Sequence, residues 1–402
     1  MPHLAPFRAI RFASEGTAPD GMSPVDGICP PYDVIDANQH QSLLDHHDHN
    51  AVRWVLGHDP SAPKGNESEY RRRGDEFRQW LEAGVLTEDP ERSLYLYRME
   101  FRDHTGRPMQ YRGVIGALEA AEWGSRGVFP HEEVHTDVVE DRLRLLEASG
   151  VDTGVVQIVV DGRDGEWARL QDEAAAKAEL LFEGEGPDGA RHTVHRLRRG
   201  EAQQAICEWL EPRDSVIADG HHRYTTLLEF GCRRGAANTP YVLAAVGDLF
   251  QEGLDIYPTH RLVTWNGTQS SGKSMAPGDL IAHLREALHD GEGQEWALQM
   301  RDGEKVAMQS RNDHPDTLAR RLRDALGSAL GELHIANYHH DPAAAEALAA
   351  STGSALLCWL PPVTREEFWQ RTTRQEVFPP KTTYFLPKIS TGIAARWLHG
   401  SE

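Results

Sequence analysis

Short apolar segments alternate with turn residues between residues 137 and 246, and this pattern constrains the fold more than any other feature of the chain. Residues 137–148 and 201–210 have apolar side chains at helical spacing, 167–181 is an alanine-rich segment expected to be helical, and 154–160 and 241–246 are apolar runs of strand length. Before them, the segments 94–101 and 111–118 flank turn residues at 103–106, which predicts an antiparallel hairpin. The alternation of helices and strands predicts a mixed α/β protein of the α+β class. Because every apolar run is far shorter than the roughly 20 residues of a membrane span, we expect neither a membrane protein nor a secreted one.

The length of 402 residues is enough for two or three domains. We expect an N-terminal α+β segment at 1–115, a core at 116–265 and a C-terminal α+β segment at 278–402. Residues 266–277 are polar and glycine-bearing, which is typical of a linker.

The charge balance excludes several classes of partner. Lys and Arg number 42 against 62 Asp and Glu, a formal net charge of -20, which argues against coating of nucleic acid or attachment to an anionic membrane. The negative net charge is still compatible with the binding of one small anionic ligand. The four cysteines form no CxxC pair, which favours reduced thiols and a cytoplasmic protein. We therefore expect a small-molecule partner; oligomeric state is not predicted.

The strongest local signal is the sequence VIADGHHRYTTLLE at 216–229. A short apolar strand is broken at Asp219-Gly220, and helical character follows, so backbone N–H groups and the positive end of a helix dipole meet at the turn. Arg223 adds a planar donor for phosphate or carboxylate, and His221 and His222 can donate or transfer protons. Asp219 is a candidate for orienting a cation or a hydroxyl group. The alternative is an N-capped helix whose aspartate satisfies its own first turn.

The sequence resembles the domain-of-unknown-function family 1015 of bacteria and archaea over nearly its whole length. Five motifs carry the resemblance in order: PPYDVI at 30–35, PHEE at 130–133 followed by DRLRLLEA at 141–148, IADGHHRY at 217–224, PTHR at 258–261 and PPKTTYFLPKISTG at 379–392.

The DGHHR element is similar to the motif of the free-serine kinases, which are built on the ParB/sulfiredoxin-like fold. The resemblance implies such a core with elaborated N-terminal and C-terminal segments, and a loop from Gly220 to Arg223 that holds nucleotide phosphates. It implies a catalytic role for Asp219, His221 and His222, and a glutamate base at Glu132, which directly follows His131. It also implies ATP or ADP as phosphoryl donor with Mg²⁺, for which Asp219 is the expected ligand.

Other residues are candidates for binding the acceptor or the phosphates. Arg142 or Arg261 can hold the carboxylate of an acceptor, although Arg142 has the spacing of a solvated helix charge. Lys381 and Lys388 lie on a proline-flanked tail that can fold over the phosphates or serve as a structural strap. The rigid loop that ends at Asp33 can line the substrate cleft or act as a scaffold.

A metal site is the chief rival hypothesis. Residues 45–49 read Asp-His-His-Asp-His, and with His221, His222 or His339-His340 they can assemble zinc or iron ligands for a metal-dependent hydrolase. Adjacent helical residues point about 100° apart, so a solvated polar turn is favoured. A non-catalytic nucleotide- or metabolite-binding regulatory protein is the other alternative.

A GxxxxGK[ST] pattern also occurs, at 267–274. Its context argues against a phosphate-binding loop, since no buried strand is expected before it and Pro277 is a poor continuation of the required helix. The segment is interpreted as the linker.

Overall fold

The computed structural model divides the chain into two compact units. Unit 1 comprises Met1–Leu254, Thr372–Glu376 and Pro387–Glu402, and unit 2 comprises Asp255–Arg371 and Val377–Leu386. The residues that the structure describes are 3–14, 16–19, 21–61, 67–134, 136–233, 240–264, 275–288, 293–300, 303, 305–311, 315–331, 335–352 and 355–398.

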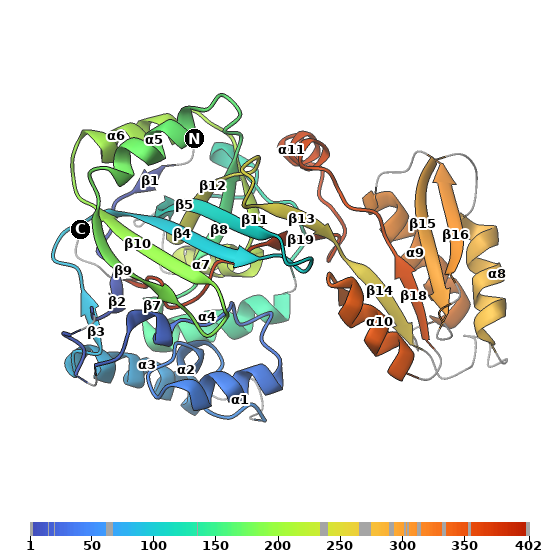
Figure 1. Ribbon diagram of the computed structural model, residues 1–402, viewed down its shortest axis with the longest axis horizontal. Helices are drawn as coiled ribbons and strands as arrows, with labels where there is room; N and C mark the ends of the chain where they lie inside the picture. The colour runs from blue at the N-terminus through green and yellow to red at the C-terminus, as the bar shows by residue number, and fades with distance from the viewer. Residues whose placement is uncertain are drawn as a thin grey trace. The chain divides into compact units, whose positions relative to one another are not determined.

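A mixed sheet forms the centre of unit 1 (Figure 1). The strands of unit 1 are β1 (Leu4–Ala5), β2 (Ile10–Phe12), β3 (Leu86–Glu88), β4 (Leu94–Arg102), β5 (Pro108–Glu119), β6 (Val128–Phe129), β7 (Val151–Asp152), β8 (Val156–Val160), β9 (Glu179–Glu185), β10 (Arg191–Leu197), β11 (Ser215–Asp219), β12 (Tyr241–Asp248) and β20 (Arg396–Trp397). Within the described residues, nine strands form the large sheet, in the order β6-β11-β8-β12-β5-β4-β10-β9 with β1 beside β5. β6 is parallel to β11, β8 is parallel to β12, and β8 and β11 are antiparallel. The predicted mixed α/β class is confirmed.

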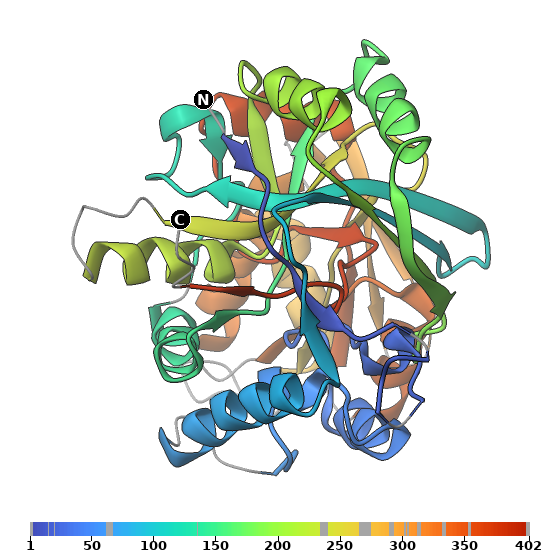
Figure 2. The same cartoon turned by 90° about the vertical axis from the view of Figure 1, so that its left-hand side faces the viewer.

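Helices cover both faces of this sheet. α5 and α6 lie on one side, and α4 and α7 lie on the other (Figures 1 and 2). The helices of unit 1 are η1 (Pro24–Gly27), α1 (Ala37–His46), α2 (Val52–Val55), α3 (Glu67–Glu82), η2 (Ser125–Gly127), α4 (Thr136–Ser149), α5 (Glu166–Ala175), α6 (Glu201–Leu210) and α7 (His221–Arg233).

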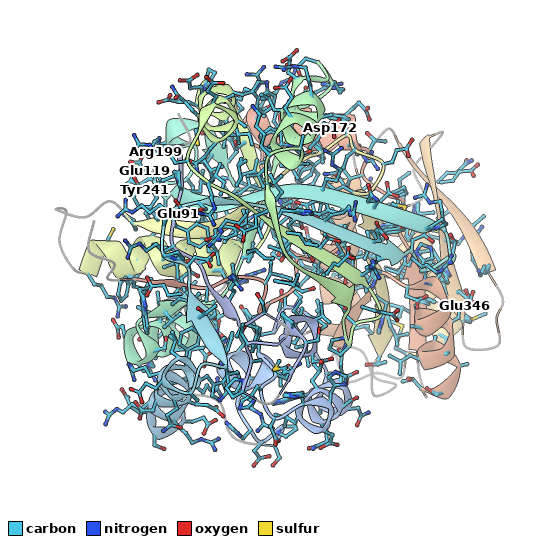
Figure 3. The ribbon with its side chains drawn as sticks, turned by 60° about the vertical axis from the view of Figure 1, so that its left-hand side comes forward. Glu91, Glu119, Asp172, Arg199, Tyr241 and Glu346 are labelled. Carbon is cyan, nitrogen blue, oxygen red and sulfur yellow. The ribbon has the colours of Figure 1, made fainter. Side chains whose placement is uncertain are left out.

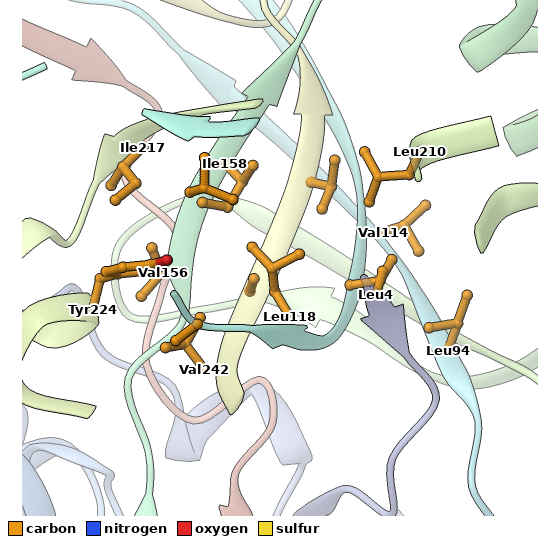
Figure 4. Packing of buried hydrophobic residues seen from close by; sticks show 14 of the residues in the cluster. Leu4, Leu94, Val114, Leu118, Val156, Ile158, Leu210, Ile217, Tyr224 and Val242 are labelled. Carbon is orange, nitrogen blue, oxygen red and sulfur yellow. The ribbon is translucent and has the colours of Figure 1, made fainter. Parts of the chain in front are cut away.

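The core of unit 1 joins the sheet to these helices. Figure 4 shows Val156, Ile158 and Ile217 on neighbouring strands, with Tyr224 of α7 beside them. Leu210 of α6 belongs to the same cluster, and each of these five side chains is at most 1% exposed. Burial of five such side chains contributes on the order of 10 kcal/mol to the stability of the core before entropy is counted.

The N-terminal helices form a second core of their own. Asp36 caps α1 by accepting a hydrogen bond from the Gln39 amide at 2.8 Å. Trp54, Phe77 and Trp80 pack together with ring-centroid distances of 4.9 and 5.2 Å from Trp54 to the other two. These helices thereby create an apolar layer beside α4.

Unit 2 is built around an antiparallel sheet of five strands among its described residues, in the order β16-β15-β18-β14-β17. β13 pairs separately with β19. The elements are β13 (Asp255–Pro258), β14 (His260–Thr264), α8 (Pro277–Leu288), β15 (Gly293–Met300), β16 (Lys305–Arg311), α9 (Pro315–Leu330), β17 (Ile335–His339), α10 (Pro342–Ser351), β18 (Ala355–Trp359), α11 (Arg365–Thr373), which ends in unit 1, and β19 (Thr383–Leu386).

The two units differ from the three segments expected at 1–115, 116–265 and 278–402. Sheet pairing explains the difference, because β4 and β5 from the first segment share a sheet with β8, β11 and β12 from the second. The chain also returns to unit 1 at its C-terminal end.

Most of the expected linker, including all of the GxxxxGK[ST] pattern at 267–274, lies outside the described residues. One argument against that pattern is corrected: the preceding strand β14 is buried and pairs on both sides, with β17 and β18. The other argument stands, since α8 begins only at Pro277, where proline is well suited to the first helical turn.

None of the described helices combines the length and the hydropathy needed to cross a bilayer. Charged side chains form ion pairs on each unit, such as Arg112 with Asp172 at 2.6 Å and Lys305 with Glu346 at 3.1 Å. Figure 3 labels the acidic partner of each pair, Asp172 and Glu346. Because these pairs are largely exposed, each contributes at most about 1 kcal/mol to stability.

Candidate functional site

The DGHHR segment forms the turn between β11 and α7. Gly220 has φ of +93°, a left-handed conformation that favours glycine, and a Cβ there would lie 3.0 Å from Nε of Arg223. The sharp turn lets α7 begin at His221, immediately after the strand. The N-terminus of a 13-residue helix therefore stands at the edge of the sheet, as the sequence predicted.

Asp219 lies between two cations. Its Oδ2 accepts a hydrogen bond from Arg223 at 2.6 Å, and its Oδ1 accepts one from Nζ of Lys388. Burial alone would raise the pKa of Asp219, but the charges of Lys388 and Arg223 outweigh this and hold its pKa well below the usual range. The carboxylate is therefore ionised, and one full positive charge remains in excess around it.

The PHEE and DGHHR motifs meet because β6 and β11 are parallel neighbours whose following loops leave the same edge of the sheet. The backbone N–H of His131 donates to Nε2 of His221 at 3.2 Å, across 90 residues of sequence. Nδ1–H of His131 donates to the carbonyl of Ile217 at 2.6 Å. Glu132 follows His131 directly and is half-buried. The structure thus places the backbone segment that carries Glu132 next to the start of α7, whereas the role of Glu132 as a base stays a prediction.

Both buried histidines are neutral at pH 7. Burial lowers the pKa of His131 to about 4, and burial together with the neighbouring His131 holds the pKa of His221 well below its ordinary value. Since Nε2 of His221 accepts the His131 N–H, its proton resides on Nδ1. His222 is half-buried on the next position of α7.

The N-terminal loop and the C-terminal strap, residues 387–392, are joined at the same site. Cys29 and Thr391 exchange two backbone hydrogen bonds of 3.1 and 2.8 Å. Gly392 has φ of +94°, and a Cβ there would lie 3.0 Å from the carbonyl oxygen of Gly27, so the strap fits closely beneath the loop. This pairing holds Lys388 against Asp219 and explains why two motifs at opposite ends of the sequence belong to one site.

Arg142 and Asp33 both lie near Arg223. The Arg142 guanidinium lies over the ring of Tyr32, with 4.3 Å between its Cζ and the ring centroid, and it donates to Asp141 and to the Val55 carbonyl. Arg142 is therefore not the solvated helix charge of the alternative interpretation. Asp33 is exposed. Burial lowers the pKa of Arg223, but the negative charge of Asp219, followed by that of Asp33, outweighs burial and raises it.

Arg261 and Lys381 belong to unit 2. Arg261 is buried on β14 and donates to the Thr259 carbonyl at 2.5 Å. Lys381 is exposed and has φ of +58°, in the segment that precedes β19. Their predicted binding roles stay predictions, whereas Lys388 is the tail lysine that the structure brings to Asp219.

The metal hypothesis gains no support from the described part of the chain, in which no three His, Cys, Asp or Glu side chains converge. His46 lies 3.3 Å from Asp26, and the ring of His49 packs edge-on against Trp80 at 5.0 Å. The predicted solvated turn at 45–49 is only partly correct, because Asp45 and His46 end α1 and His49 is half-buried. Asp219 alone is also a poor preformed metal ligand, because a cation already contacts each of its oxygens.

Sequence reasoning missed a buried polar chain that anchors the strap. Tyr97 bonds Nδ1 of His192 at 2.9 Å, Nε2 of His192 lies 3.0 Å from Asp188, and Ser390 donates to the other oxygen of Asp188 at 3.1 Å. The available signal in the sequence was the polar pair Ser390 and Thr391 between the apolar residues Ile389 and Ile393.

Comparison with known proteins establishes the family. A model of the family described as "Protein of unknown function (DUF1015)" matches residues 4–327, which is more than half of the chain. The chain therefore belongs to this family, and the resemblance inferred from its motifs is confirmed. A search of curated proteins found no match.

Several solved structures are similar at low identity. A conserved hypothetical protein from Pyrococcus furiosus has 17% identity and a TM-score of 0.37, covering 69% of this chain and 92% of that one. Free serine kinase in complex with AMP has 15% identity and a TM-score of 0.38, covering 68% and 87%. C-terminally truncated SbnI from Staphylococcus aureus has 10% identity and a TM-score of 0.39, covering 72% and 90%. Likeness at this level does not identify an activity.

Proposed function

We propose that this protein is a nucleotide-dependent kinase that phosphorylates a hydroxyl group of a small, serine-like amino acid or related metabolite. The observation that carries the proposal is the convergence of Arg223 and Lys388 on Asp219 at the N-terminus of α7. Phosphoryl transfer requires mainly positioning and positive charge around the phosphates, and this turn supplies both. The motif resemblance to free-serine kinases points to the same chemistry.

Each residue of the site has a separate role in the proposed phosphoryl transfer. The amides at Gly220 and His221 bind the terminal phosphate, and Arg223 and Lys388 stabilise its charge. Glu132 accepts the proton of the acceptor hydroxyl as its oxygen bonds to phosphorus. The bond from phosphorus to the bridging oxygen breaks, and the nucleotide leaves one phosphate shorter. His221 positions the PHEE loop through its hydrogen bond to His131, in place of the proton transfer expected from the sequence.

Mg²⁺ fits this site only with a rearrangement. Asp219 is the carboxylate that would hold it, and Lys388 would have to leave Oδ1 and turn to the phosphates. Bound there with the nucleotide, Mg²⁺ supplies further positive charge to the transferring group.

The experiment incubates the full chain with ATP or ADP, Mg²⁺ and a panel of free hydroxy amino acids and small alcohols, and detects the phosphorylated product by ³¹P NMR. Glu132→Gln should lower the rate by about 100-fold or more while retaining nucleotide binding. Glu133→Gln is the matched control, because Glu133 is the exposed neighbour. Nucleotide binding without any product would support the non-catalytic alternative, and absence of both would reject the proposal.

A further inference from the structure

A largely apolar cavity of about 70 Å³ lies in unit 1 beside Arg223. Most of its wall comes from α2, α3, α4 and α7, which lie close together on one side of the large sheet (Figure 1). The rest comes from Tyr32, from residues 151–154 and from Thr391 of the strap. Trp54, Phe77 and Leu146 form part of the wall, and none of them is more than 8% exposed. The proposed phosphate turn uses the start of α7, whereas this cavity borders Thr226 and Leu227 further along the same helix.

The charged residues of the cavity wall are mostly positive. Arg73, Arg142 and Arg223 line it, and the one carboxylate in the wall, Asp152, is 3.5 Å from Arg396. The carboxylates that contact these arginines, such as Asp141 and Asp219, do not line the cavity. Although each of these arginines also contacts a carboxylate behind the wall, the guanidinium groups are the charged groups that face the cavity in excess, so an anionic group is the charged ligand that best complements it.

The volume shows what kind of group fits. A single buried water needs about 10–15 Å³ of such space, so 70 Å³ has room for an apolar group of several carbon atoms. Side chains such as Trp54, Phe77 and Leu146 offer water few hydrogen bonds, and an apolar group that replaces the water gains free energy. The single side-chain carbon of serine would fill little of this space.

We propose that the cavity binds the acceptor, and that the acceptor is a hydroxy acid with a branched or aromatic body: its carboxylate faces Arg142 and Arg223 while its apolar body occupies the cavity. This assignment rests on the proposed function and specifies its substrate class. A nucleobase is the less suitable occupant, because it is uncharged and has no need of three arginines in one wall.

The test measures equilibrium binding to the full chain by calorimetry without nucleotide. L-leucine serves as the probe because it has the carboxylate and a branched body but no hydroxyl, so that no transfer follows. Leucine should bind at least about tenfold more tightly than alanine, from the burial of its three additional carbons. Leucinamide, which lacks the carboxylate, should bind about tenfold more weakly than leucine.

Leu145→Phe fills the rim of the cavity from a half-buried position and should weaken leucine binding at least about tenfold. Leu180→Phe is the matched control on β9, where Leu180 is 50% exposed, and should leave leucine binding unchanged. Circular dichroism confirms that both variants are folded.

Equal affinities for leucine and alanine, or leucine binding that Leu145→Phe leaves intact, would overturn the assignment. Adenosine binding that this variant abolishes would assign the cavity to the base instead. Because no nucleotide is present, the two proposals fail separately: leucine binding without phosphoryl transfer in the panel assay refutes only the kinase function.

Discussion

The turn after β11 in unit 1 and the PTHR segment at 258–261 in unit 2 both place histidine and arginine next to buried strands, but their contacts differ. In unit 1, Asp219 is contacted by Arg223 and by Lys388, which is 169 residues away in sequence. In unit 2, Arg261 donates to the carbonyl of Thr259, two residues away, and His260 accepts the Leu360 amide at 3.2 Å. A motif indicates a reactive site when distant segments bring several charged side chains to one point, and a structural role when uncharged backbone groups satisfy its polar side chains.

The largest loss of phosphoryl transfer is expected when the carboxylate of Asp219 is removed. Asp219→Asn leaves Arg223 and Lys388 without their counter-charge and should lower phosphoryl transfer by about 100- to 1000-fold. Asp255→Asn is the matched control, since it removes the 2.5 Å pair with Arg365 in unit 2. Product formation should stay within about twofold of the parent in this control, because this half-buried pair belongs to unit 2 and takes no part in the proposed transfer. Equal losses of product formation in Asp219→Asn and Asp255→Asn would contradict the functional difference between the two motifs.

Acidification should destabilise both units through buried histidines. Burial lowers the pKa of His131 in unit 1 and of His260 in unit 2 to about 4, while the unfolded chain binds those protons near pH 6.5. The free energy of unfolding is therefore undiminished above pH 6.5 and falls as the pH decreases toward 4, by about 3 kcal/mol per residue.

Urea titrations at pH 7.5 and pH 5 measure this loss. His131→Asn and His260→Asn should each reduce the pH dependence, but only His131→Asn should weaken nucleotide binding at pH 7.5. A stability that is independent of pH over this interval would contradict the buried, neutral state of the two rings.

The two tail lysines, Lys388 and Lys381, are expected to differ in their contribution to nucleotide binding by a smaller factor. Lys388→Ala should weaken nucleotide binding by about 10- to 100-fold, the size expected for one charge-assisted hydrogen bond. Lys381→Ala should change it less than about twofold, because Lys381 is an exposed residue of unit 2. Calorimetric titration with ADP distinguishes them, and a matching loss for Lys381→Ala would show that unit 2 contributes to the phosphate site.

The smallest effect concerns two glycines. A Cβ at Gly154 would lie 2.7 Å from Cδ of Arg223, so Gly154→Ala should displace that guanidinium and lower kcat/KM several-fold, on the order of 1 kcal/mol. Gly278 at the start of α8 has open space around it, and Gly278→Ala should leave kcat/KM unchanged. Parent-like kinetics for Gly154→Ala would mean that the position of Arg223 does not matter.

Local signals predicted much of the fold. α6 begins and ends as expected at 201–210, and the hairpin of β4 and β5 has the predicted antiparallel pairing, because periodicity and turn residues determine both. The predicted helix at 167–181 is wrong at its end: α5 stops at Ala175, and Glu179–Glu185 forms β9. Pairing with β10 overrides the helical propensity there.

The candidate site was predictable as separate motifs but not as an assembly. The phosphate turn follows from a strand, a glycine and a helix within a few residues. The contact between His131 and His221 depends on the parallel pairing of β6 with β11, and the position of Lys388 depends on the bridge from Cys29 to Thr391. Neither pairing can be recognised from the local sequence. The sequence alone therefore does not distinguish Lys388 from Lys381 as the lysine that binds the phosphates.

A crystal structure of the protein with ADP and Mg²⁺ tests the central claim most directly. We expect the phosphates within hydrogen-bond distance of the Gly220 and His221 amides, with Lys388 moved from Asp219 to a phosphate oxygen. Phosphates bound instead at the GxxxxGK[ST] segment, 267–274, or an unchanged pair of Lys388 and Asp219 with no nucleotide beside it, would contradict this account.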